Sequence, residues 1–257
     1  MPDLTISAIS KRFGGVVALD GVSLAVREGE IVGLIGPNGA GKTTVFNCIS
    51  RFYAPDSGSI SYGDTNLMRL APDAVINRGI SRTFQQAELF KTMTVLDNLL
   101  IGLHKRTGFT QLASLVLSPT TWLDERRLRS VALEMIDFMG LGPVRDMPAG
   151  SLPFGQQKRV DLARALVSSP SLVLMDEPAA GLSHDELRAL GDLIKRIRSD
   201  LKVNVLLVEH HMALVMSISD RVVVLDFGKN IAEGTPQEVQ GNPRVIEAYL
   251  GRADAQN

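Results

Sequence analysis

Short runs of apolar residues recur along the chain and predict the strands of a sheet that is buried on both faces. The runs lie at residues 31–35, 172–175, 203–208 and 221–225, and residues 80–84 are a further plausible strand of mixed composition. Parallel strands are covered by helices on both sides, so in sequence they form continuous apolar runs instead of alternating patterns. The pattern predicts an α/β fold. At the N-terminus, apolar and polar residues alternate at 4–9 and more loosely at 18–26. This alternation predicts an antiparallel element with one solvated face.

The middle of the chain has a helical pattern. A helix should begin at Thr94, because Thr94 and Asp97 match a capping box before an apolar run. No strand pattern occurs from residue 104 to 142, and an apolar stripe at helical spacing ends before Gly140 and Gly142. These features predict an all-helical insertion between two α/β pieces.

Composition excludes several classes of protein. The 257 residues can form one domain with an insertion. A formal net charge of -1 without long charged runs gives no indication of a nucleic-acid partner. The single cysteine, Cys48, excludes an intramolecular disulfide and suits a reducing compartment; we expect it to be a small buried residue. No apolar run has the length of a membrane-spanning helix, so any work at a membrane should go through a partner.

A phosphate-binding loop follows the first apolar run. The pattern G-x-x-x-x-G-K-[ST] is matched by Gly36, Pro37, Asn38, Gly39, Ala40, Gly41, Lys42 and Thr43, with Thr44 next. A strand before it and a helix after it give the setting that the motif requires. Backbone amides and the helix N-terminus would bind the phosphates, Lys42 would reach the β- and γ-phosphates, and the Thr43 hydroxyl would ligate Mg²⁺. The alternative, a glycine-rich turn without a ligand, rarely matches every position in this setting.

Polar side chains follow other predicted strands. Asp176 and Glu177 directly follow the run at 172–175. Successive side chains of a strand point in different directions, so one carboxylate could bind a metal and the other a water. His210 and His211 come after the run at 203–208. A metal cluster is disfavoured, because no cysteine or third histidine lies at ligand spacing. One of the two histidines can instead hydrogen-bond a phosphoryl oxygen. Gln85 follows the plausible strand at 80–84 and either touches the phosphate site or is a solvated amide.

Two further segments bear on ligand binding. Phe13, beside two glycines, is either a core residue next to a turn or a flat surface on which a nucleobase stacks. Residues 151–157 precede a helix whose N-terminus is a second anion-binding end, where Gly155 allows close approach.

The order of these segments resembles the nucleotide-binding domain of ATP-binding-cassette (ABC) proteins over nearly the whole chain. The resemblance implies a P-loop NTPase fold of the ABC type, with a RecA-like core, an N-terminal antiparallel β subdomain and a helical insertion subdomain. It implies one domain over residues 1–257, with residues 1–85 and 151–257 as the catalytic core and 86–150 as the helical subdomain. The implied cofactors are ATP and Mg²⁺.

The same resemblance implies roles for individual residues. Adenine would stack on Phe13, and residues 36–44 would bind the phosphates. Gln85 and Asp176 would contact metal or water, Glu177 would be the general base, and His210 would be the γ-phosphate switch. Gly155 and Gln156 would face the nucleotide of the opposing subunit, and residues 180–183 would form a loop that crosses the dimer interface.

The chain departs from the family pattern at one motif. The signature usually reads Leu-Ser-Gly-Gly-Gln, whereas this chain has Pro153 and Phe154 at its second and third positions. Proline has neither a hydroxyl nor an N–H, so two donors to the γ-phosphate are missing, while the Gly155 N–H and the helix end remain. A second departure is His211, where the family usually has aspartate.

Within the family, residues 82–85, 176–182 and 242–251 are similar to the larger ATPase subunit of branched-chain amino acid importers. This similarity implies transmembrane permease subunits, a second ATPase subunit that is either the same chain or a shorter relative, and an indirect link to a solute-binding protein. It implies a peripheral position on the cytoplasmic face of the plasma membrane. Related branches serve urea, aromatic acids and lipopolysaccharide export.

Two other classes of function are alternatives. A soluble, non-transport ABC ATPase would carry tandem cassettes or a long coiled coil, and neither pattern is present. A non-hydrolysing binding module is disfavoured by the intact Lys42, Asp176, Glu177 and His210. For the importer, we expect Leu89, Phe90 and Met93 to line a groove for a permease helix; the alternative is that they pack inside the helical subdomain.

Overall fold

A six-stranded sheet forms the centre of the computed structural model, which describes residues 2–83, 88–103 and 119–250, with the side chains of 119–124 and 250 left out. Its strand order is β10-β9-β3-β8-β7-β6. The strands are β3 (Ile31–Ile35), β6 (Ile80–Arg82), β7 (Leu172–Asp176), β8 (Asn204–Val208), β9 (Arg221–Asp226) and β10 (Lys229–Gly234). All pairs are parallel except β9 with β10. The strands predicted at the four apolar runs are confirmed. The strand predicted at 80–84 is present as β6 but ends at Arg82, and Phe84 lies outside the described residues.

A second sheet, entirely antiparallel, lies beside the first and has the order β2-β1-β4-β5. Its strands are β1 (Leu4–Phe13), β2 (Val16–Val26), β4 (Ser57–Tyr62) and β5 (Thr65–Asn66). Alternate residues of β1, among them Leu4 and Ile6, are buried while their neighbours are exposed. The predicted antiparallel element with one solvated face is therefore confirmed.

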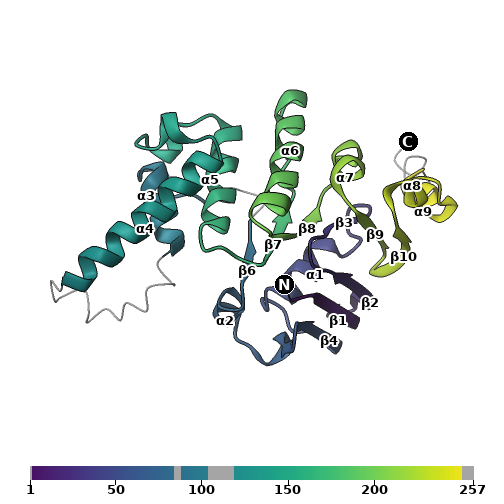
Figure 1. Ribbon diagram of the computed structural model, residues 1–257. Helices are drawn as coiled ribbons and strands as arrows, with labels where there is room; N and C mark the ends of the chain where they lie inside the picture. Colours follow the sequence, from purple (N-terminus) through teal and green to yellow (C-terminus); the bar gives the residue numbers. More distant parts are fainter. Residues whose placement is uncertain (1, 84–87, 104–118, 251–257) are drawn as a thin grey trace.

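Helix α1 (Lys42–Ile49) is packed between the two sheets (Figure 1). Its residues Val45, Phe46 and Ile49 share one hydrophobic cluster with the small sheet and with one face of the large sheet. Cys48 belongs to this cluster and is fully buried, as predicted, and burial raises the pKa of its thiol to about 11. The strand that precedes the phosphate loop and the helix that follows it are thus held by core packing.

The other face of the large sheet is covered by helices that form a second hydrophobic cluster. They include α5 (Phe154–Leu166), α6 (His184–Asp200), α7 (Met212–Ile218), α8 (Pro236–Gln240) and α9 (Pro243–Leu250). The small elements α2 (Pro72–Ile76) and η1 (Leu67–Arg69) precede β6. No helix among the described residues is long and apolar enough to cross a membrane.

The elements between β6 and α5 are helical throughout the described residues, in line with the predicted insertion. They are α3 (Val95–Leu103), α4 (Pro119–Phe138), η4 (Gly142–Val144) and η5 (Ala149–Ser151), and Figure 1 shows α3 and α4 beside α5 at one end of the molecule. The Thr94 hydroxyl accepts from the Asp97 N–H at 3.0 Å, which confirms the predicted helix start. Helix α4 ends at Phe138, and Gly140, two residues later, has a φ of 68°. The predicted end of the helix before Gly140 is therefore also confirmed.

Candidate functional site

Three glycines shape the loop between β3 and α1. Gly36, Gly39 and Gly41 have φ values of 150°, 80° and 104°, which side chains rarely allow. A Cβ atom on Gly36 would lie 2.1 Å from the Leu225 carbonyl oxygen, and one on Gly41 would lie 2.7 Å from that of Ala18. Neighbouring backbone therefore leaves no room for any residue but glycine at these two positions.

Lys42 is held inside this loop. Its side chain is 8% exposed, and its Nζ donates to the carbonyl oxygens of Gly36 at 2.7 Å and Pro37 at 3.0 Å. Gly41 caps α1 without a side chain, so no capping side chain competes with a ligand for the amides of the first turn. An ammonium group inside a ring of backbone and an uncapped helix N-terminus fit a phosphate group well.

The remaining loop residues lie around this cradle. Asn38, Gly39 and Thr43 are exposed, Thr44 is half-buried, and Pro37 and Ala40 are buried. The C-terminal helix α9 reaches the same loop: burial raises the pKa of the Tyr249 phenol to about 12, and its hydroxyl lies against the Gly36 backbone. Tyr249 was not identified from sequence, because nothing local links it to a loop more than two hundred residues away.

Asp176 ends β7 in a buried position. Its Oδ2 accepts from the Arg82 guanidinium at 2.7 Å, and Arg82 also donates to Asn47 of α1 at 2.8 Å. Arg82 thus joins the ends of β6 and β7 to the helix that follows the phosphate loop, which places Asp176 beside that helix. The sequence interpretation assigned no role to Arg82, although a charged residue within a short predicted strand was a visible signal.

Glu177 and His210 follow adjacent strands and come together in space. The His210 Nδ1 lies 3.9 Å from the Glu177 Oε2. The Glu177 N–H donates to the Val208 carbonyl at 2.9 Å, and φ 48° turns the backbone out of the strand at this residue. A non-glycine residue in that conformation costs about 1–3 kcal/mol, a cost that is typical of functional sites.

A second carboxylate, Glu209, was missed in the sequence. It is fully buried; its Oε1 accepts from the Ala179 N–H at 2.7 Å, and its Oε2 accepts from the N–H groups of His210 and His211 at 3.1 and 3.3 Å. Side-chain ligand atoms of Glu209, His210 and His211 lie within 4.8 Å of one another. Both Glu209 oxygens are already bonded to backbone, so the carboxylate fixes the loop after β7 against the loop after β8.

The N-terminus of α5 has a different construction. Pro153 precedes the helix, and Phe154 is 48% exposed at its first position. A Cβ atom on Gly155 would lie 2.3 Å from the Glu186 Oε1, and one on Gly181 would lie 2.9 Å from the Phe154 ring. Residues 154 and 155 are therefore packed against the loop after β7 and against α6, with the Phe154 ring partly open to solvent.

Phe13 ends β1 and is 42% exposed. Its ring meets the Tyr53 ring edge-on with centroids 5.0 Å apart, and the Lys11 Nζ lies 5.5 Å from its centroid. The interpretation of Phe13 as a core residue is therefore wrong, whereas the exposed ring remains compatible with stacking. Gln85 lies outside the residues that the structure describes.

A parallel sheet, a glycine loop that ends in a buried lysine and a neighbouring strand that ends in carboxylates define a protein of the P-loop class. A family model described as ABC transporter matches residues 19–180. A second, described as branched-chain amino acid ATP-binding cassette transporter, matches residues 229–255. The chain belongs to the ABC transporter family and is an ATPase of the ATP-binding-cassette type.

Individual relatives agree with this assignment. The chain is 43% identical to the high-affinity branched-chain amino acid transport ATP-binding protein BraF of Pseudomonas aeruginosa, with 98% of this chain and 99% of the relative covered. It matches a crystal structure described as the ADP conformation of an ATP-binding cassette with TM-score 0.85 and 34% identity, over 98% and 99% of the two chains. A dimeric cassette bound to ADP and Pi in a post-hydrolysis state matches with TM-score 0.75 and 27% identity, over 91% and 98%.

Proposed function

We propose that this chain is the ATP-hydrolysing subunit of an importer for branched-chain amino acids. The observation that carries the ATPase part is the phosphate cradle around Lys42, next to the carboxylates that end β7. The solute is supported by the branched-chain amino acid transporter family that matches residues 229–255 and by the similarity to BraF, a branched-chain amino acid transport ATP-binding protein. No specific observation favours urea, aromatic acids or lipopolysaccharide.

In this proposal ATP lies along residues 36–44. The backbone amides of the loop and the N-terminus of α1 bind the phosphates, and Lys42 turns its ammonium from the loop carbonyls toward them. Adenine stacks on the exposed ring of Phe13. Gln85 stays a proposed contact on the strength of the family resemblance.

The residues present also fit Mg²⁺, an ion that prefers oxygen ligands. The exposed Thr43 hydroxyl and the Asp176 carboxylate, which Arg82 holds beside α1, would bind it. Bound Mg²⁺ supplies charge neutralisation for the phosphate oxygens.

Glu177 is proposed as the general base. It accepts a proton from the water whose oxygen attacks the γ-phosphorus, while the bond to the β-γ bridging oxygen breaks and ADP and phosphate form. His210, at 3.9 Å from Glu177, is placed to hydrogen-bond a γ-phosphate oxygen. Because Glu209 holds the backbone of His210, its ring approaches the phosphate from a fixed position.

Replacing Glu177 with Gln tests this assignment. Loss of a general base typically slows a reaction by about 10²–10⁴-fold. We expect Glu177→Gln to bind ATP normally, to accumulate as an ATP-bound dimer and to hydrolyse ATP at a rate reduced by that factor. The matched control is Glu247→Gln, at an exposed position on α9. Near-normal turnover of Glu177→Gln in the presence of the permease would contradict the role.

We further propose that the chain acts as a dimer, with itself or with a shorter ATPase, on the cytoplasmic face of the membrane through permease subunits. The dimeric cassette among the similar structures supports this pairing. The division into a core of residues 1–85 and 151–257 and a helical subdomain of 86–150 is part of the same proposal, as is the crossing of the interface by residues 180–183.

The expected permease groove needs a correction. Leu89 is 9% exposed and belongs to the hydrophobic core, so it packs inside the protein as the alternative predicted. Phe90 is 49% exposed and Met93 is half-buried. Phe90 therefore remains the proposed apolar contact for a permease helix. Leucine-stimulated ATP hydrolysis in vesicles that contain permease and binding protein, compared with urea, tests the solute.

A further inference from the structure

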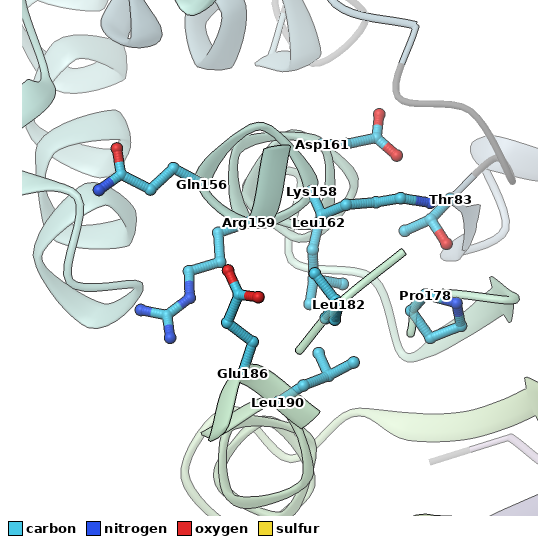
Figure 2. Close-up of a pocket in the computed structure, with 11 residues that line it drawn as sticks. Thr83, Gln156, Lys158, Arg159, Asp161, Leu162, Pro178, Leu182, Glu186 and Leu190 are labelled. Atoms are coloured by element: carbon cyan, nitrogen blue, oxygen red, sulfur yellow. The ribbon is translucent and has the colours of Figure 1, made fainter. Parts of the chain in front are cut away.

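A cavity of about 240 Å³ lies between α5, α6 and the loop after β7 (Figure 2). None of its lining residues belongs to the phosphate loop, although Gly155 and Gln156 contribute to its wall. An engineered protein cavity of about 150 Å³ binds benzene, and pockets for drug-sized molecules begin at about 300 Å³. The volume of this cavity lies between these two values and suits a small metabolite.

A buried hydroxyl at one end of this cavity lacks a partner. Thr83 is 5% exposed, and its Oγ1 has no hydrogen bond. Its backbone is fixed, since its N–H donates to the Leu174 carbonyl at 2.9 Å. Buried polar atoms nearly always have a partner, and an exception inside a cavity points to a bound polar group.

Two charged groups accompany this hydroxyl. Lys158 is 9% exposed, and Figure 2 shows its side chain reaching toward Thr83. Burial lowers the pKa of Lys158. Nearby carboxylates, Asp161 above all, partly offset this effect because they favour the charged ammonium. Asp161 is 3% exposed and binds Arg164 through Oδ1 at 2.8 Å. An ammonium, a hydroxyl and a carboxylate therefore all line the polar part of the cavity.

The other end is aliphatic. Leu162 of α5, Leu182 of the loop after β7 and Leu190 of α6 contribute to the cavity wall. At the rim, Arg159 and Glu186 carry opposite charges and interact with each other (Figure 2). With Lys158 and Asp161, the ionisable groups that line the cavity comprise two cations and two anions. A ligand that carries one positive charge, one negative charge and a branched apolar group matches this wall.

We propose that this cavity binds a free aliphatic α-amino acid such as leucine. Its carboxylate meets Lys158 and Thr83, its ammonium meets Asp161, and its side chain lies among the three leucines. Because the wall is shared by α5, α6 and the loop between β7 and α6, occupancy holds these segments together. Any effect of bound leucine on ATP turnover depends on the proposed function, whereas the binding of leucine to the cavity does not.

Calorimetric titration of the nucleotide-free protein with L-leucine tests the proposal. Two probes lack one charge each: isocaproate is leucine without its amino group, and isopentylamine is leucine without its carboxylate. The variants are Thr83→Val, which has nearly the same shape without the hydroxyl, and Lys158→Met. Lys195→Met, on the exposed side of α6, is the matched control.

We expect the protein to bind one leucine per chain and to bind both truncated probes much more weakly. The affinity for leucine should be about tenfold or more lower in Thr83→Val and Lys158→Met. It should be unchanged in Lys195→Met. Absence of saturable leucine binding would overturn the proposal. So would equal affinity in Thr83→Val, whose conservative change should leave the fold intact, or equal binding of isocaproate. ATP binding and hydrolysis, measured separately, report on the proposed function and not on this cavity.

Discussion

The N-termini of α1 and α5 are both proposed to face phosphate groups, yet the protein builds them in opposite ways. The end of α1 is enclosed: the two sheets pack around the helix, Lys42 is bonded to its own loop, and backbone surrounds Gly36. The end of α5 is open: Pro153 offers no N–H, Phe154 is half-exposed, and the close neighbour of Gly155 is the side-chain carboxylate of Glu186 instead of backbone.

This difference is in line with the proposal that the first end binds the phosphates of its own chain, whereas the second end meets the phosphate of a partner chain. Figure 1 shows α5 at the end of the molecule with α3 and α4, while α1 lies between the sheets. The proposed dimer would therefore have shared sites, each made from α1 of one chain and α5 of the other.

Mixing two inactive variants tests the comparison with the largest expected effect. Lys42→Ala removes the phosphate-binding lysine, and Phe154→Asp places a negative charge at the open end, where it repels phosphate. In a mixed dimer one shared site combines both defects, and the other keeps an intact loop and an intact α5. We expect each variant alone to be inactive and the mixture to regain ATP hydrolysis, measured as phosphate release.

Phe154→Asn is the control for the added charge and should retain more activity than Phe154→Asp. Gly155 is a less suitable position, because any side chain there meets Glu186. If the mixture is as inactive as its components while the wild-type chain alone hydrolyses ATP, the two ends do not share a site across chains.

Alanine at the two glycines should separate the enclosed end from the open end. In Gly36→Ala the Cβ meets the Leu225 carbonyl, which the sheet holds in place, so we expect the loss of more than about 4 kcal/mol of unfolding free energy. In Gly155→Ala the Glu186 carboxylate can rotate away. The cost is its hydrogen bonds to Ser183, so we expect a much smaller loss than in Gly36→Ala. Urea denaturation measures both; equal losses would show that the ends are equally rigid.

Glu209→Gln should destabilise the protein less than Gly36→Ala, and it tests how the loops after β7 and β8 are held together. The glutamine amide has one oxygen that can still accept a hydrogen bond. Its NH₂ group would face a backbone N–H, either that of Ala179 or those of His210 and His211, and could not accept from it. We expect a loss of about 1–3 kcal/mol of stability and a lower kcat with an unchanged affinity for ATP. Wild-type kcat and melting temperature in this variant would mean that Glu209 does not position His210.

The features that sequence alone determined are local. Continuous apolar runs identified the parallel strands other than β6, alternation identified the antiparallel sheet, and capping at Thr94 located α3. Each of these patterns depends on neighbours within a few residues. The phosphate loop was equally legible, since its glycines, lysine and hydroxyl follow one another in sequence. Motif order then sufficed for the family.

The tertiary structure decided which distant residues meet. Arg82 reaches Asp176 across 94 positions and Glu209 reaches Ala179 across 30, because β6, β7 and β8 are neighbours in the sheet. Burial was decided in the same way: Phe13 is exposed and Leu89 is in the core, although both are apolar residues beside turns. Strand order and helix packing set these outcomes, since they depend on the hydrophobic contacts of the whole chain and not on any short pattern.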